Sequence, residues 1–326
     1  MERKSQIVVS DLVPAGIHVL QHVVRQVLKD ARDDPESAFE SVRIGKQKKL
    51  ALRVDINAED SFKRELRKYH KGKFKNVKVY GEESLRSKNL NLSRKKETMV
   101  LVDAIDGTDL LEQGISNWCS AAVFFDPRNQ KGKRIMGAFV CLPTGDVYYA
   151  TSESESEKAG AFVKRITEKA SEPVCGRTKV KSIKRASICF YGQKADNFLS
   201  VVEHPFSKNL SRLNRQAKKA KKLDIRIFNM AGIPMMLRLI DHRVTHARGI
   251  DAVFDLKGQK PHDFVPGAFI AYRAGAVIRT LSGKKVSLEM MEDLLTHPAS
   301  GLIKYVITST ESLATALFQM FKKGRV

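Results

Sequence analysis

Two short acidic segments contain the residue types of a metal site. Glu82 and Glu83 directly follow Gly81, and Asp103 and Asp106 belong to the sequence DAIDGT. Carboxylates that a fold brings together repel each other unless cations lie between them. Their hard oxygen atoms are the ligands that Mg²⁺ prefers in proteins. We therefore expect these side chains to share a magnesium site.

The residues around the two aspartates predict how they are positioned. The apolar run Met99–Val102 is typical of a buried strand, which would deliver Asp103 and Asp106 at its C-terminal end. Gly107 and Thr108 follow, and backbone N–H groups at the start of a helix or turn bind phosphate readily. Oxygen ligands beside such a turn indicate magnesium-assisted phosphoryl chemistry.

The wider pattern alternates strands and helices and predicts a mixed α/β fold. Helical spacing predicts one helix over residues 10–33 and a second over 57–69, which would hold Asp60 in its first turn. Further helices are expected at 205–222, 231–240 and 264–274. Strands are expected at 77–80, 120–125, 135–142, 147–150, 186–190, 224–228, 252–254 and, as the last one, 276–280.

The composition indicates an ordinary globular protein. With 326 residues and 42% apolar content, the chain can bury a substantial core in one large unit or two domains. Its four cysteines are widely spaced without a CxxC pair, so we interpret them as reduced core thiols. The charged N-terminus precedes no apolar run that could serve as a signal peptide or membrane span. We expect a cytoplasmic protein without a membrane partner.

The formal net charge of +22 is compatible with several functions. A positive field attracts small anionic substrates and raises their association rate. It equally favours loose, salt-sensitive binding to nucleic acid. Lysine and arginine side chains that are simply solvated would give the same charge, so the charge alone does not select a function.

A third element, HDFVPG at residues 262–267, completes a pattern typical of one enzyme family. Together with GEES at residues 81–84 and DAIDGT, it makes the chain resemble the inositol monophosphatase superfamily of magnesium-dependent, lithium-sensitive phosphatases, which includes fructose-1,6-bisphosphatases and phosphoadenosine nucleotidases. The resemblance implies a layered αβαβα fold of the α/β (α+β) class with mixed sheets. We expect an N-terminal half at residues 1–165 and a C-terminal half at 166–326.

The resemblance implies a set of metal ligands. Glu82, Asp103 and the backbone carbonyl of Ile105 would hold a first Mg²⁺ ion. Asp103, Asp106 and Asp263 would hold a second, and Glu82 would hold a weaker third ion. Mn²⁺ is expected to be able to replace Mg²⁺ at these positions.

The resemblance also implies how water is activated. Thr108 would work with Glu82 to orient and deprotonate the attacking water, and Asp60 matches a family aspartate near that group. Several positions depart from the family pattern. Ala104 replaces the usual proline, Asn57 a frequent threonine, His262 the usual tryptophan, and Val265 and Pro266 the usual pair of alanines. These changes leave the acidic residues in place.

A further set of residues is expected to contact the substrate. The N–H groups of Gly107 and Thr108 would receive the phosphate, beside Asp106. Asp255 matches an acidic residue that contacts the substrate in relatives, and Ala231 lies in a segment that lines their substrate pocket. The resemblance implies a small anionic phosphate as substrate, and many relatives are homodimers.

The leading prediction is a Mg²⁺-dependent phosphomonoesterase for a sugar or cyclitol phosphate, such as inositol-1-phosphate or fructose-1,6-bisphosphate. A second prediction keeps the mechanism and changes the substrate to 3′-phosphoadenosine 5′-phosphate, although no pair of aromatic residues is placed to stack adenine. A third is a non-catalytic, nucleic-acid-associated protein on the same scaffold. Its only support is the charge, because the sequence has no RNP-like or helix-turn-helix pattern.

Overall fold

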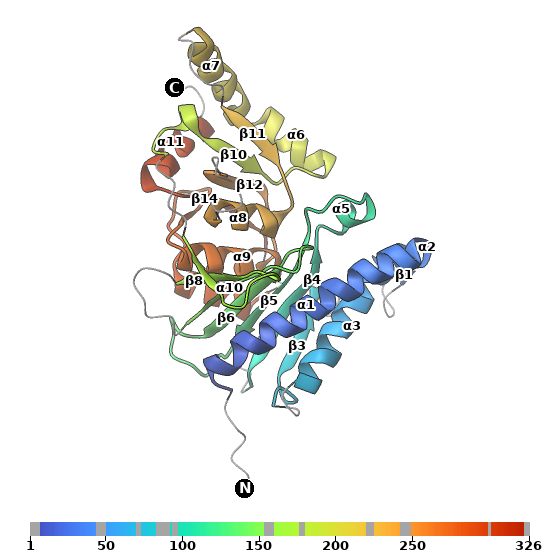
Figure 1. Cartoon of the computed structure of the whole chain (residues 1–326). Helices are drawn as coiled ribbons and strands as arrows, with labels where there is room; N and C mark the ends of the chain where they lie inside the picture. Colours follow the sequence, from blue (N-terminus) through green and yellow to red (C-terminus); the bar gives the residue numbers. More distant parts are fainter. Residues whose placement is uncertain are drawn as a thin grey trace.

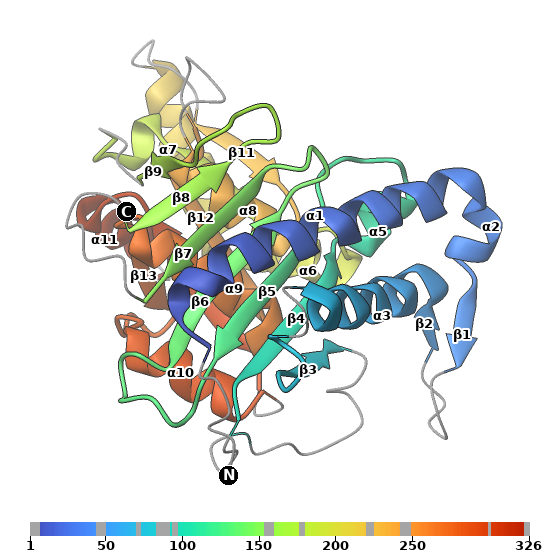
Figure 2. The ribbon, with the colours of Figure 1, turned by 60° about the horizontal axis from the view of Figure 1, so that its bottom comes forward.

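The chain folds into alternating layers of helices and sheets (Figures 1 and 2). The structure is a computed structural model that describes residues 7–43, 50–69, 73–82, 92, 97–152, 160–175, 180–219, 225–241, 249–298 and 301–322. The expected Glu83 lies outside these residues, as does Ser84. Within the described part, no helix is long and apolar enough to cross a membrane.

A seven-stranded sheet forms the second layer, in the order β3-β4-β5-β6-β7-β8-β9. β3 pairs with β4 in parallel and the other neighbours are antiparallel. Residues of β5, β6 and β7 are buried on both faces, because helices cover both sides of the sheet. The strands are β3 (Lys78–Gly81), β4 (Met99–Asp106), β5 (Cys119–Phe125), β6 (Ile135–Cys141), β7 (Val147–Thr151), β8 (Ala161–Lys164) and β9 (Glu172–Val174).

Two antiparallel-lying helices, α1 (Val9–Asp33) and α3 (Arg53–Lys68), form the outer layer on this sheet, in front of it in Figure 2. The apolar side of α1, from Leu12 to Val27, packs against the sheet in one hydrophobic cluster with Phe139 and Phe62. Along the chain, α1 is followed by α2 (Pro35–Ala38) and by the short hairpin of β1 (Ser41–Arg43) and β2 (Leu50–Leu52), which leads into α3.

The central layer of helices lies between the two sheets. It consists of α8 (Gly232–Ile240), α9 (Pro261–Arg273) and α10 (Leu288–Thr296). The helix α9 contacts strands of both sheets, and its residues from Phe264 to Ala271 are fully buried. A single hydrophobic cluster joins Val123 of the first sheet, Phe269 of α9 and Ile307 of the second sheet. This continuous core fixes the two sheets relative to each other.

A five-stranded sheet and its outer helices complete the fold. The strand order is β11-β10-β12-β14-β13, with parallel pairs at β10 and antiparallel pairs at β14. The strands are β10 (Ser187–Phe190), β11 (Arg226–Asn229), β12 (Ala252–Gln259), β13 (Val277–Thr280) and β14 (Ile303–Thr308). The outer face carries α6 (Ala195–Glu203), α7 (Pro205–Lys219), α11 (Glu311–Phe321) and the short 3₁₀ helix η2 (Ile183–Arg185).

This arrangement confirms the expected layered fold with mixed sheets and differs from the sequence predictions in several places. The expected last strand at 276–280 is followed by α10, β14 and α11, and β14 pairs between β12 and β13. The expected boundary at 165/166 falls inside the first sheet, because β9 still pairs with β8. Of the four cysteines, Cys175 is exposed and the other three are buried free thiols.

Candidate functional site

Asp103 lies at the centre of a group of carboxylates. It is near the C-terminal end of β4, where the pairing with β5 shifts register between Asp103 and Asp106. The residue is 4% exposed. Burial, followed by the negative charges of Asp263, Asp106, Glu82 and Asp55, raises the pKa of Asp103 well above its usual range. The structure therefore brings the predicted acidic ligands into one electrostatic environment.

Asp106, the last residue of β4, connects the first sheet to the central helices. Its Oδ2 accepts a hydrogen bond of 2.6 Å from the backbone N–H of Ile233, in the first turn of α8. Burial raises the pKa of Asp106 to about 7, against the opposing effect of this N–H donor. The charges of Asp263 and Glu82 raise the pKa further, so the same carboxylates act on both aspartates.

The turn after Asp106 requires glycine. Gly107 has a left-handed backbone with φ of 96°, a conformation that residues other than glycine rarely adopt. A Cβ atom at this position would lie 3.2 Å from Cβ of Trp118 and 3.3 Å from Cβ of Ala231. The short helix α5 (Thr108–Glu112) begins directly after this glycine. Ala231, a predicted substrate contact, thus lies against the DAIDGT turn.

Thr108 is held by Asp55, which the sequence analysis missed. The Thr108 hydroxyl lies 2.9 Å from Oδ1 of Asp55 and 3.2 Å from the backbone carbonyl of Ile105, and both can accept its hydrogen bond. Asp55 is in the first turn of α3. An aspartate in the first turn of a helix is the signal that could have identified it.

Asp60 was expected beside the water-activating group, and the structure contradicts this placement. Its side chain is 65% exposed and pairs with Lys63 one turn further along α3. The physical reason is the start of the helix, at Arg53 rather than at Asn57, which moves the first-turn position from Asp60 to Asp55. The neighbouring Glu59 is buried instead, against Gly81.

Glu82 and Asp263 approach the group from two other elements. Glu82 directly follows β3, and its Oε1 accepts a hydrogen bond of 3.2 Å from Nζ of Lys260. Lys260 is the N-cap of α9, and Asp263 lies in the first turn of that helix. The expected ligands therefore come from β3, β4 and α9, which are distant in sequence.

Asp255 is buried on β12 rather than open to solvent, with 1% exposure. Its Oδ1 accepts hydrogen bonds from the backbone N–H groups of Lys257 and Gly258, where β12 shifts register against β14. Its Oδ2 has no hydrogen bond among the described residues, and burial raises the pKa of the Asp255 carboxyl. On the neighbouring strand β14, Asp255 pairs in register with Tyr305, whose hydroxyl is likewise without a described partner. One oxygen of Asp255 thus shapes a turn, and the other is available to a ligand.

The donor set fits a divalent cation. Burial raises the pKa of Asp103 and Asp106, and neighbouring carboxylates raise it further, an effect that a bound cation would oppose. The buried Oδ1 of Asp263 also has no hydrogen bond in the described part of the chain. No three acidic, histidine or cysteine side chains among the described residues converge as the ligands of one ion do. The oxygen atoms suit Mg²⁺ or Mn²⁺ in their chemistry, and binding requires them to draw closer.

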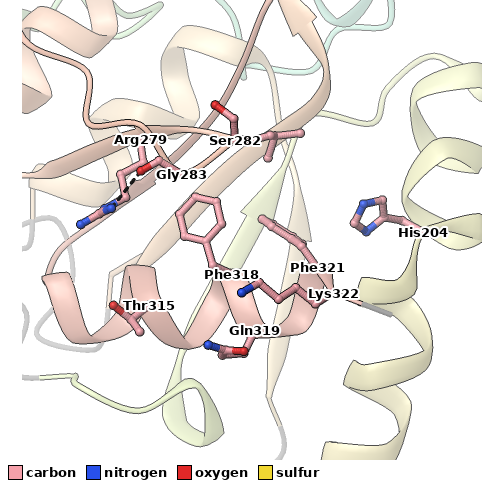
Figure 3. Close-up of a pocket in the computed structure, with 10 residues that line it drawn as sticks. His204, Arg279, Ser282, Gly283, Thr315, Phe318, Gln319, Phe321 and Lys322 are labelled. Atoms are coloured by element: carbon pink, nitrogen blue, oxygen red, sulfur yellow. Dashed lines mark hydrogen bonds between the residues drawn. The ribbon is translucent and has the colours of Figure 1, made fainter. Parts of the chain in front are cut away.

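A cavity of about 450 Å³ lies elsewhere, on the outer side of the five-stranded sheet (Figure 3). It is lined by Phe318 and Phe321 of α11, by Arg279 of β13 and by His204. None of the predicted site residues lines it. The guanidinium of Arg279 donates to the carbonyl of Gly283 and pairs with Glu311, so its charge is already compensated.

Comparison with known proteins gives relatives by structure alone. No family model matches the sequence, and no curated protein matches it. A Pyrococcus horikoshii hypothetical protein with similarities to inositol-1 monophosphatase is 19% identical, with a TM-score of 0.59, covering 93% of this chain and 96% of that one. The extragenic suppressor protein SuhB from Bartonella henselae is 15% identical, with a TM-score of 0.63, covering 96% and 99%.

A third similar structure was determined with a ligand. It is inositol monophosphatase II from Staphylococcus aureus with bound inositol monophosphate, which is 15% identical, with a TM-score of 0.59, covering 95% of this chain and 94% of that one. The same protein has also been determined with bound 2′-AMP. Because these identities are low, the comparison concerns the fold. The chain has the fold of the inositol monophosphatase and SuhB structures.

Proposed function

We propose that this protein is a phosphomonoesterase that depends on a divalent cation and hydrolyses a small sugar or cyclitol phosphate. The observation that carries the proposal is the group formed by Asp103, Asp106, Asp263 and Glu82, in which the charges of Asp263 and Glu82 raise the pKa of both Asp103 and Asp106. Beside this group stands the hydrogen-bonded pair of Thr108 and Asp55. Buried acids next to a hydroxyl–carboxylate pair are typical of metal-assisted hydrolysis.

The protein's own residues would prepare the attacking water. When Thr108 donates its hydroxyl hydrogen to Asp55, its oxygen lone pairs remain free to accept a hydrogen bond from water. Asp55 can then take up the proton that leaves the water through Thr108. Two divalent cations held by Glu82, Asp103, the Ile105 carbonyl, Asp106 and Asp263 would supply charge neutralisation for the phosphate and the leaving oxygen.

The substrate would be bound where the end of β4 meets the starts of α5 and α8. The N–H groups of Gly107 and Thr108 belong to the start of α5, where backbone donors have no partner within the helix. Ala231 and the start of α8 lie beside this turn. Inositol monophosphate bound to the Staphylococcus aureus protein of the same fold supports a cyclitol phosphate as the first substrate to test.

The test is a phosphate-release assay with Mg²⁺ or Mn²⁺. Substrates are inositol-1-phosphate, fructose-1,6-bisphosphate, 2′-AMP and 3′-phosphoadenosine 5′-phosphate, each with and without millimolar Li⁺. We expect turnover of at least one cyclitol or sugar phosphate, loss of it with EDTA, and inhibition by Li⁺. Asp103→Asn is the matched negative control. A folded, cation-loaded protein that releases no phosphate from any of these esters would refute the proposal.

A further inference from the structure

His262 is a buried histidine whose ring nitrogens are not satisfied by the rest of the described chain. It is the second residue of α9, and its side chain is 2% exposed. Neither Nδ1 nor Nε2 makes a hydrogen bond to a described residue. Leaving a buried polar group without a partner costs about 1–3 kcal/mol. An apolar ring would pack at this position without that cost, so the imidazole requires an explanation.

The His262 ring is directed at Asp263, one of the clustered carboxylates. Nε2 of His262 lies 3.0 Å from Oδ1 of Asp263, and this oxygen is also buried without a hydrogen bond among the described residues. The two atoms are close, yet their angles are not those of a hydrogen bond. His262 also affects the Asp106 carboxyl, because its charge would lower the pKa of that group. The imidazole therefore belongs to the same site as the acids of β4.

The distance between the two atoms is the distance between neighbouring ligands of one metal ion. Two donors bound at right angles on an octahedral cation, each at about 2.1 Å, are about 3.0 Å apart. Nε2 of His262 and Oδ1 of Asp263 lie 3.0 Å apart, and with the ring proton on Nδ1 each atom offers a lone pair. A shared cation would satisfy both atoms at once, which neither achieves alone.

We propose that His262 Nε2 and Asp263 Oδ1 bind the same divalent cation, and that this nitrogen makes the site prefer Mn²⁺ or Co²⁺ to Mg²⁺. Mg²⁺ is a hard ion that prefers oxygen ligands, whereas an imidazole nitrogen binds first-row transition metals more tightly than Mg²⁺, Co²⁺ more so than Mn²⁺. The inference rests on the proposed function only in that both use the same cation site. It changes the expected cofactor from magnesium to a transition metal.

The direct test is pulsed electron paramagnetic resonance of Mn²⁺ bound to the full chain. We expect modulation from a directly coordinated ¹⁴N nucleus in the wild-type protein and its loss in His262→Phe, which keeps a ring of similar size. His204→Phe is the matched control, because His204 lines the distant cavity of Figure 3. If His262→Phe does not fold, His262→Asn provides the comparison.

Calorimetric titration supplies a second measurement that does not depend on turnover. The ratio of Mg²⁺ to Mn²⁺ dissociation constants should fall by about tenfold in His262→Phe and remain unchanged in His204→Phe. Bound Mn²⁺ without ¹⁴N modulation in the wild type, or an unchanged ratio in both variants, would overturn this inference and leave the proposed phosphatase function intact. A chain that binds neither ion would refute both proposals.

Discussion

At the scale of residues, the candidate site depends on carboxylates that pack close together without a countercharge. Burial raises the pKa of Asp103 and Asp106 and stores a free-energy cost that a cation can remove. Asp55 has a different role, because its carboxylate accepts the hydroxyl hydrogen of Thr108. The metal-binding acids and the proton-accepting acid are therefore separate residues with separate tests.

Exchanging Asp55 for asparagine should lower kcat by about 10²–10³-fold with little change in the thermal midpoint, because the proton acceptor behind Thr108 is lost. Asp60→Asn is the matched control on the same helix and should retain nearly wild-type kcat, since its side chain is exposed. Steady-state kinetics on the best substrate of the panel measure both variants. Equal losses in the two variants would argue against the assigned role of Asp55.

The raised pKa of Asp106 predicts a pH dependence of stability in the metal-free protein. Because its folded pKa of about 7 exceeds the unfolded value of 3.8, the folded state holds this proton more tightly. The stabilisation is complete below the unfolded pKa and is lost as the pH rises through about 7. In EDTA, the thermal midpoint should therefore fall between pH 5 and pH 8, and saturating Mg²⁺ should restore it at pH 8.

Asp106→Asn provides the control for this pH dependence. The amide does not ionise, so the metal-free variant should lose less stability than the wild type over the same pH range. Differential scanning calorimetry in matched buffers measures the effect. A wild-type midpoint that rises from pH 5 to pH 8 in EDTA would contradict the assignment.

At the scale of elements, one helix of the central layer carries a glutamate that holds a loop of the first sheet. Glu292 of α10 is fully buried. It accepts hydrogen bonds from the backbone N–H groups of Gly132 at 2.7 Å and Arg134 at 2.6 Å, with Ile135 at 3.4 Å. Gly132 and Arg134 lie in the connection between β5 and β6, and Ile135 is the first residue of β6. A carboxylate that accepts several backbone donors fixes the position of the loop relative to the helix.

Glu292→Gln should destabilise the protein by about 2–3 kcal/mol, because the amide group offers hydrogens to a site built from N–H donors. The exposed Glu289 on the same helix is the control, and Glu289→Gln should have a much smaller effect. Urea denaturation monitored by circular dichroism gives both free energies of unfolding. Equal stability of the two variants would show that the loop is held by other contacts.

At the scale of the whole molecule, the two sheets behave as parts of one core. Besides the shared hydrophobic cluster, a buried polar contact joins the central layer to the first sheet, since Asp241 at the end of α8 accepts hydrogen bonds from Tyr148 and Arg165. The Arg165 contact measures 2.9 Å, and the Asp241 side chain is 1% exposed. Removing one partner of a buried ion pair lowers the stability of the protein strongly, because the other charge stays buried without its partner.

Asp241→Asn should lower the free energy of unfolding by about 3 kcal/mol, whereas Tyr148→Phe, which removes only one hydroxyl, should cost about 1 kcal/mol. The fluorescence of Trp118, the only tryptophan, reports on the first sheet, and circular dichroism reports on the whole chain. The two transitions should coincide in the wild type. Separate midpoints would show that the halves unfold independently.

The sequence alone determined the local part of this protein. The apolar run before Asp103 predicts the strand β4, and Gly107 predicts the turn, because both depend on neighbouring residues and backbone preferences. The long helix at residues 10–33 was predicted from its periodicity and is confirmed as α1. The layered fold followed from the resemblance of three short motifs.

Only the tertiary structure decided which acids meet. The start of α3 at Arg53 places Asp55 on Thr108 and turns Asp60 to solvent, although both residues are aspartates on one helix. The packing of α9 between the sheets brings His262 and Asp263 to the acids of β4. Such contacts depend on how distant elements pack, and the spacing of residues along a chain does not encode the position of a helix start to within one turn.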